Sequence, residues 1–240
     1  MPPLAPFARL VAHDVRLQYR HGFYLAYLVV VVFYGVALQF LPPDYRLPVA
    51  GLMIYSDPSV YGFFFAGAIL LLERGDGTHQ ALFAAPVSPA RYLACKTLSL
   101  GLLALLSSAA IALATLQGGW NPVLMAAGVV LTSFLFVLAG IIAATRIQNF
   151  YRFLVVMGPA SVLFFIPTAG HFGLADFPLA RLLPTRAGLL VVAAAMEPGR
   201  FAGAEVAQAL AALAVWVALA WLWAHRWLRR YVVEQWGERA

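Results

Sequence analysis

The residues best placed to carry function lie in one polar connector, Glu73 to Lys96, between two uncharged apolar segments. Gly75-Asp76-Gly77 is a breaker cluster that should turn the chain. Thr78–Ala85 can then form a short helix with Thr78 as its N-cap, and Pro86 ends it. These residues do not form a pattern typical of a catalytic site. A short helix held between two apolar segments can instead pass force from a soluble partner to them.

The chain after the connector carries a strong helix start, because Ser88 is a good N-cap and proline is favoured at the first helical position, here Pro89. We expect Arg91 and Lys96 to form a polar collar on that helix. The alternative is a connector that contacts no partner at all. The residues expected to contact the partner are Glu73, Gly77, Thr78, Leu82, Phe83, Pro86, Ser88 and Arg91.

A second polar connector, Arg146–Arg152, could form a smaller contact with the same partner through Gln148, Asn149 and Arg152. A loop that only sets topology explains this segment equally well.

The composition places the elements that hold these connectors in a membrane. The chain has 240 residues, of which 63% are hydrophobic and 11% charged, and its mean hydropathy is +0.84. Soluble domains carry about 25% charged residues. The net charge of +6 comes from basic residues scattered over short connectors, which argues against nucleic-acid binding. The single cysteine, Cys95, excludes an intrachain disulfide and a cysteine-based metal cluster.

Six apolar runs approach the length of about 17–25 residues that a membrane-spanning helix needs. They are residues 23–41, 58–72, 97–117, 123–145, 153–170 and 206–227. The second run is short and could extend back through 48–56. A seventh run, Ala187–Met196, is too short to span and predicts an interfacial or re-entrant helix before the last span. The fold expected is one all-α transmembrane domain over residues 1–240.

The basic residues give the expected orientation. With six spans both termini share one side, and twelve of the 16 lysines and arginines fall on that side. The other four are Arg46, Arg181, Arg186 and Arg200. Because positive residues are enriched in cytoplasmic segments, the termini and the Glu73–Lys96 connector should be cytoplasmic. A cleaved signal peptide is not expected at the N-terminus.

Residues 1–22 form a candidate amphipathic helix, in which Arg9, His13, Arg16 and Arg20 share one face. Such a helix would lie in the headgroup plane and bend near His21-Gly22 into the first span. An ordinary positive flank is the alternative. Asp14 lies near the edge of the apolar face and slightly weakens the amphipathic pattern.

The sequence contains no energy-coupling machinery of its own. A phosphate-binding P-loop needs Gly-x-x-x-x-Gly-Lys-Ser/Thr, and no glycine precedes the only lysine, Lys96, at the required spacing. An ion-driven carrier would need ionisable groups inside the bilayer, and we expect none at mid-depth in the spans. The chain is therefore not expected to be an enzyme or to hold a cofactor or metal. A partner subunit would bind ATP and magnesium and supply the energy.

A substrate pathway would use polar or aromatic side chains at the spans. Asp57 could bind a cationic substrate, although an N-cap role before Pro58 at the outer interface fits its position better. Tyr61–Phe65 and the pairs Phe134/Phe136 and Phe164/Phe165 could line a drug pathway, or face lipid. The pathway candidates are Asp57, Tyr61, Phe65 and Phe134.

The connector resembles the cytoplasmic signature of ABC type-2 permeases. The matching residues are Glu73-Arg74, Gly77-Thr78, Leu82, Pro86-Val87-Ser88 and Tyr92-Leu93 with Lys96. Ser56-Asp57-Pro58 followed by Gly62-Phe63-Phe64 is similar to small bacterial multidrug permeases that export fluoroquinolones. The acidic residue usual near the start of the coupling helix is displaced here, to Asp76 in the turn.

This resemblance implies the permease subunit of an ATP-driven exporter in a bacterial plasma membrane. It would act as a homodimer, or as a heterodimer with a homologous permease, coupled to a cytoplasmic ATPase and surrounded by lipid. A drug-like or lipophilic substrate follows from the same resemblance. The rival classes are an intramembrane enzyme, for which the spans lack a catalytic set, and a membrane scaffold that transports nothing.

Overall fold

The computed structural model describes residues 4–75, 88–116, 118–147, 149–166 and 183–237, and these are helical with no strand among them. The N-terminal part comprises α1 (Leu4–Arg20), α2 (Phe23–Gln39), α3 (Pro43–Ser56), the π-helical turn η1 (Asp57–Tyr61) and α4 (Gly62–Gly75). After the connector follow α6 (Pro89–Thr115), α7 (Pro122–Arg146), α8 (Phe150–Ala160), the 3-10 turn η2 (Ser161–Phe165), α10 (Pro184–Met196) and α11 (Gly203–Gly237).

Four of these helices are long and apolar enough to cross a membrane: Pro43–Gly75, Pro89–Thr115, Pro122–Arg146 and Gly203–Arg230. Helices α1 and α2 pass the same test only as a pair bent by 64°, so up to five spans satisfy length and composition in the described part. Phe150–Phe165 and Pro184–Met196 are shorter apolar helices. The protein is therefore an all-helical, multi-pass membrane protein.

The bend between α1 and α2 lies at the position that the sequence indicates. Gly22 adopts φ +77°, a left-handed conformation that costs glycine little and other residues more. The arginines of α1 are exposed, whereas Asp14 and Gln18 on its other side are buried. The exposed side of the helix is therefore basic, as predicted, whereas its buried side includes polar residues.

The second span is longer than predicted, because the helix begins at Pro43 and not near residue 58. It continues through Pro48, as the extension over 48–56 allowed, and through Pro58, where the apolar run predicts the start of the span. Pro58 has no amide hydrogen to donate, and the chain widens there into the π-helical turn η1. One continuous element therefore carries Asp57 inside it.

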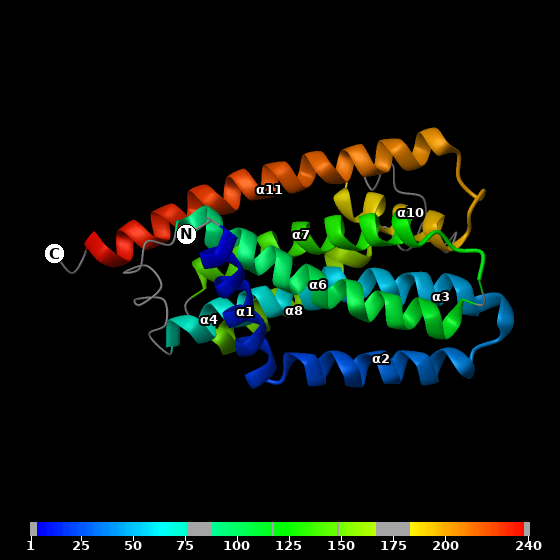
Figure 1. The fold of residues 1–240 in the computed structure, drawn as a ribbon, viewed down its shortest axis with the longest axis horizontal. Helices are drawn as coiled ribbons and strands as arrows, with labels where there is room; N and C mark the ends of the chain where they lie inside the picture. Colours follow the sequence, from blue (N-terminus) through cyan, green and yellow to red (C-terminus); the bar gives the residue numbers. More distant parts are fainter. Residues whose placement is uncertain (1–3, 76–87, 117, 148, 167–182, 238–240) are drawn as a thin grey trace.

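Helix α7 is the centre of the bundle and contacts α3, α4, α6, α8, α10 and α11 (Figure 1). Its ordered start follows from Asn121, whose side chain accepts hydrogen bonds from the amides of Val123 and Leu124 at 3.1 Å. Ser88 caps α6 by accepting from the amide of Arg91, which confirms the predicted helix start.

Helix α10 covers the predicted short helix at 187–196 and extends it back to Pro184. It is buried against α3, α7 and α11 and does not lie on the outside of the bundle.

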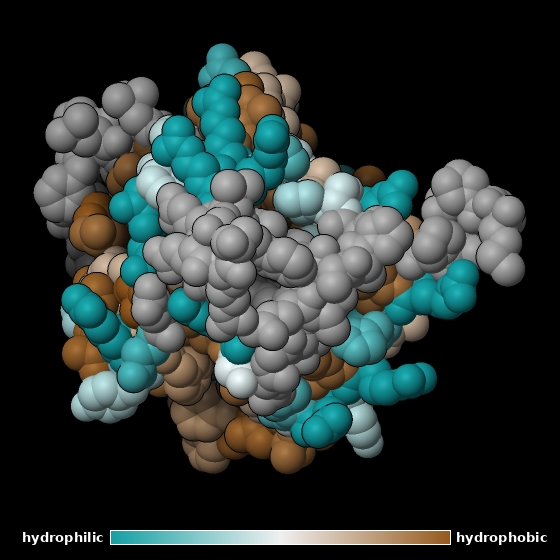
Figure 2. Space-filling view, turned by 90° about the vertical axis from the view of Figure 1, so that its left-hand side faces the viewer, coloured by the Kyte–Doolittle hydropathy of each residue, from teal (hydrophilic) through white to brown (hydrophobic). Residues whose placement is uncertain are grey.

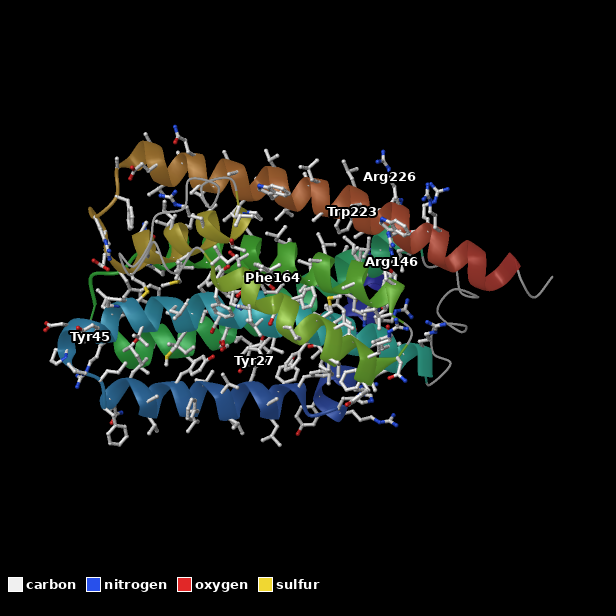
Figure 3. All side chains as sticks on the ribbon, turned by 180° about the vertical axis from the view of Figure 1, so that it is seen from behind. Tyr27, Tyr45, Arg146, Phe164, Trp223 and Arg226 are labelled. Carbon is white, nitrogen blue, oxygen red and sulfur yellow. The ribbon has the colours of Figure 1, made fainter. Side chains whose placement is uncertain are left out.

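The two ends of the bundle differ in character. Helix α1, the end of α4, the start of α6 and the C-terminal part of α11 share one end, and the α2–α3 connection lies at the other (Figure 1). Hydrophilic side chains surround the first of these ends (Figure 2), and Arg146 and Arg226 lie near it (Figure 3). The guanidinium of Arg146 lies 3.7 Å from the ring centroid of Trp227, which joins α7 to α11 there. We call this end the basic end.

Candidate functional site

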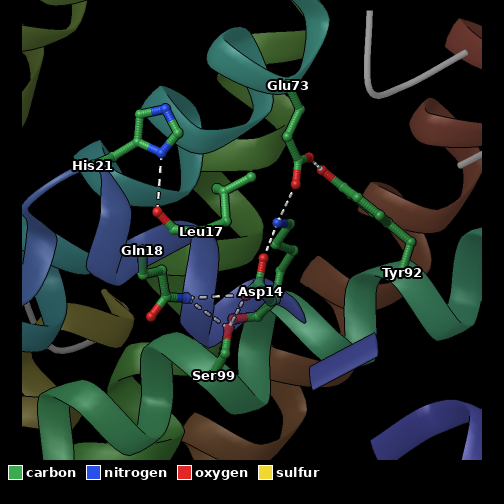
Figure 4. Close-up of polar contacts among 8 residues, drawn as sticks. Asp14, Leu17, Gln18, His21, Glu73, Tyr92 and Ser99 are labelled. Carbon is green, nitrogen blue, oxygen red and sulfur yellow. Dashed lines mark hydrogen bonds and ion pairs between the residues drawn. The ribbon is translucent and has the colours of Figure 1, made fainter. Parts of the chain in front are cut away.

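A buried cluster of charges lies at the basic end, centred on the protein's only lysine. The ammonium of Lys96 on α6 lies between the carboxylates of Asp14 on α1 and Glu73 on α4, and its contact with Glu73 measures 2.6 Å (Figure 4). All three side chains are at most 4% exposed. Removing such charges from water is costly, so each depends on its partners.

Neutral groups complete the cluster. The hydroxyl of Tyr92 donates to Glu73 at 2.6 Å, and the amide of Gln18 donates to Asp14 and to Ser99 at 2.9 Å. The Ser99 hydroxyl also donates to Asp14. These residues come from α1, α4 and α6, so the cluster fixes three helices to one another where the connector begins and ends.

This geometry corrects two sequence predictions. Lys96 is not part of an exposed collar, because it lies seven residues inside α6, about 10 Å along the helix from its start. Asp14 does not weaken the N-terminal helix, because it is the group through which α1 binds α6. Charge pairing between distant segments leaves no periodic signal in the sequence, which is why both roles were missed.

Most of the predicted coupling residues lie outside the described residues: Gly77, Thr78, Leu82, Phe83 and Pro86. Glu73 is buried in the cluster, whereas Ser88 and Arg91 are exposed at the start of α6. In the second connector Gln148 also lies outside the described residues. Asn149 caps α8 by accepting from the amide of Tyr151 at 2.8 Å, and Arg152 is exposed.

A second polar site lies inside the membrane-spanning part. Asp57 was predicted to cap a helix at the outer interface, and that prediction is wrong. The helix runs through it, the side chain is fully buried, and one carboxylate oxygen accepts a hydrogen bond from Ser107 on α6. The expectation of no ionisable group inside the spans is therefore also wrong.

Of the predicted pathway residues, Tyr61 and Phe65 lie together and Phe134 does not join them. Tyr61 and Phe65 pack against each other, and both contact Tyr27 of α2, at centroid distances of 5.3–5.8 Å. Phe134 packs against Gly101 of α6. Tyr27 was not among the candidates, because one tyrosine in a long apolar run carries no distinguishing pattern.

An apolar cavity of about 730 Å³ lies between α7, α8, η2, α10 and α11. Its walls include Phe136, Phe164, Trp216 and Trp223, and Arg146 is its charged lining residue. Two of these, Phe136 and Phe164, belong to the aromatic pairs considered for a drug pathway. Cavities of about 300–1,000 Å³ with apolar walls suit drug-sized molecules.

The multi-pass helical fold, the polar groups buried within it and the apolar cavity are features that membrane permeases share. Residues 6–236 match the model of the fluoroquinolones export permease protein family, so the chain belongs to that family. Two similar proteins are the fluoroquinolones export permease proteins of Mycobacterium tuberculosis strains CDC 1551 / Oshkosh and ATCC 25618 / H37Rv. Each is 26% identical over 238 residues, which cover 99% of both chains.

Proposed function

We propose that this permease is the membrane subunit of an ATP-driven export system and that a separate cytoplasmic ATPase subunit powers it. Membership in the fluoroquinolones export permease family, over nearly the whole chain, is the observation that carries the proposal. The names of the relatives support an amphipathic, drug-like substrate, fluoroquinolones included. The apolar cavity has a volume that suits such a molecule.

The proposal places six spans across the bacterial plasma membrane, with the basic end in the cytoplasm. Two copies, or this chain and a homologous permease, would enclose the substrate pathway. The ATPase would bind ATP and magnesium and contact the connector that contains Leu82 and Phe83, with Asn149 and Arg152 as a second contact. Movement of the connector would reach α1, α4 and α6 together, because the Asp14–Lys96–Glu73 cluster joins them.

Purification of the tagged permease from its own membranes in mild detergent tests this proposal. We expect a stoichiometric P-loop ATPase by mass spectrometry, and a lower ratio of ATPase to permease for Leu82→Asp. Gln39→Asp is the matched control, because Gln39 is exposed at the opposite end of the bundle. If the ATPase is absent even after cross-linking at the connector, the coupled-transporter proposal is refuted.

A cysteine at Gln80 tests the orientation. In a Cys95→Ser background, Gln80→Cys should react with a membrane-impermeant maleimide only when the cytoplasmic face is accessible. Cys95 is buried and should react little with the maleimide, and its replacement leaves the introduced cysteine as the single reactive thiol. Asp44→Cys, exposed at the opposite end, should show the reverse pattern. Labelling of Gln80→Cys in intact cells would overturn the proposed topology.

A further inference from the structure

Asp57 is an ionisable residue whose hydrogen-bonding capacity is only partly satisfied. The residue is 0% exposed, and its Oδ1 atom has no hydrogen-bond partner among the residues that the structure describes. The other oxygen accepts only from the neutral hydroxyl of Ser107. No basic side chain of the described part forms an ion pair with it. An ionised carboxylate so far from water is strongly unfavourable without a cation.

The residues around Asp57 suit an organic cation. Tyr61 ends the five-residue turn that Asp57 begins, and Tyr27 of α2 packs against Tyr61. The two tyrosine rings lie 5.5 Å apart, and aromatic faces attract ammonium groups. Tyr34 adds a further hydroxyl, 3.2 Å from that of Ser56. A carboxylate on the same turn as one phenol ring, with a second ring packed against the first, offers both the charge and the surface that a protonated amine requires.

The local backbone is also unusual. Asp57 opens the five-residue π-helical turn η1, in which the amide of Gly62 bonds to the carbonyl of Asp57. Such turns occur mostly as single insertions in α-helices, frequently at functional sites. The turn lies in the interior of the element Pro43–Gly75, within the membrane-spanning part.

Helix α2 contributes Tyr27 to this site, and few of the other side chains of α2 are buried. Only Phe23, Tyr27 and Leu38 of α2 are buried, and its outer face exposes Leu25, Val29 and Phe33. Tyr27 points from α2 into the bundle (Figure 3). Helix α2 meets α1 at the left-handed Gly22, so a bend and not a continuous helix links it to the helix that the charge cluster anchors.

We propose that Asp57, with Tyr27 and Tyr61, forms a binding site for the protonated amine of an amphipathic substrate. This inference rests on the proposed export function for the identity of its ligand. The site is separate from the apolar cavity, whose lining includes none of these three residues. Tyr55, two residues from Asp57, faces the cavity side and donates to the carbonyl of Phe164 at 3.1 Å. The cavity can hold an apolar molecule, whereas the site at Asp57 would bind a molecule that carries a positive charge.

Binding of radiolabelled tetraphenylphosphonium, a permanent lipophilic cation, tests the site. The wild-type permease, purified with its accompanying subunits in lipid nanodiscs, is compared with Asp57→Asn and Asp57→Glu. We expect Asp57→Asn to raise the Kd for the cation by at least about ten-fold and Asp57→Glu to restore part of the affinity. Asp44→Asn is the matched control, an exposed acid at the start of the same element, and should leave Kd unchanged.

A second measurement uses wild-type protein, in case Asp57→Asn does not fold. Dicyclohexylcarbodiimide modifies carboxyl groups in apolar surroundings, and peptide mass spectrometry can follow Asp57, Asp14 and Glu73 in one sample. We expect tetraphenylphosphonium to protect Asp57 and to leave the other two unchanged.

An unchanged Kd in folded Asp57→Asn, or no selective protection of Asp57, would overturn the inference. So would a wild-type protein that fails to bind the cation. If wild-type protein that does not bind the cation still co-purifies with its ATPase, the export proposal stands and only the cation site is refuted. Absence of the ATPase refutes the export proposal, and the binding comparison still decides the role of Asp57.

Discussion

Replacing Lys96 by methionine is expected to destabilise the folded permease by about 3–5 kcal/mol, because it removes the ammonium group that pairs with the buried carboxylates of Asp14 and Glu73. Methionine keeps most of the length of the side chain, so the loss reports on charge and not on volume. The midpoint of thermal unfolding in detergent should fall, and so should the yield of monodisperse protein.

Arg200→Met provides the matched control. Arg200 pairs with Glu197 as Lys96 pairs with Glu73, but the Arg200 and Glu197 side chains are 39% and 31% exposed. Exposed ion pairs contribute about 0–1 kcal/mol, so this variant should unfold close to the wild-type temperature. Equal effects of the two substitutions would contradict the role given to the buried cluster.

A triple variant separates charge from packing. Lys96→Met combined with Asp14→Asn and Glu73→Gln removes all three charges and keeps similar shapes. Neutral replacement of a whole buried ion cluster is often tolerated far better than loss of one member. The triple variant should therefore recover much of the stability that Lys96→Met loses.

The apolar runs predicted most of the fold, because membrane insertion imposes a simple length and composition on each helix. The start of α6 lies where its predicted capping residue indicates, and the bend between α1 and α2 lies at the predicted glycine, Gly22. The start of the second span was misplaced at Pro58, because a proline is typical of a helix end or start. The π-helical turn that accommodates Pro58 has no sequence signature.

The functional groups were harder to predict, because they depend on contacts between distant segments. Asp14 lies 82 residues from Lys96, and Asp57 lies 50 residues from Ser107. From the sequence alone, the position of Asp57 at the edge of an apolar run predicts a helix cap. The position of Lys96 near a connector likewise predicts an exposed side chain. The family motif did single out Glu73, Tyr92 and Lys96, but not the N-terminal helix that completes their cluster.

Close contacts between helices could not be predicted from the sequence either. Glycine and alanine are so frequent here that the spacing of small residues predicts no particular contact. In the structure, Gly140 of α7 lies directly against the backbone of α4. A Cβ atom at this position would lie 2.2 Å from the carbonyl oxygen of Phe63 and 3.0 Å from its carbonyl carbon.

Gly140→Ala is therefore expected to force α4 and α7 apart and to cost about 1–3 kcal/mol or more, as overpacking does elsewhere. The obstacle is backbone and not a flexible side chain, so no rotamer change can relieve it. Because α7 is the central helix, the damage should spread to its other contacts. Thermal unfolding in detergent measures the loss.

Gly35→Ala is the control within the same membrane domain. Gly35 lies inside α2, and a Cβ atom there would have nothing within 4 Å. Alanine is the better helix former by about 1 kcal/mol, so this substitution should be neutral or slightly stabilising. If both substitutions had the same effect, helix propensity and not the contact between α4 and α7 would explain the result. A loss confined to Gly140→Ala would instead identify that contact as the close-packed centre of the bundle, on the element that carries both Asp57 and Glu73.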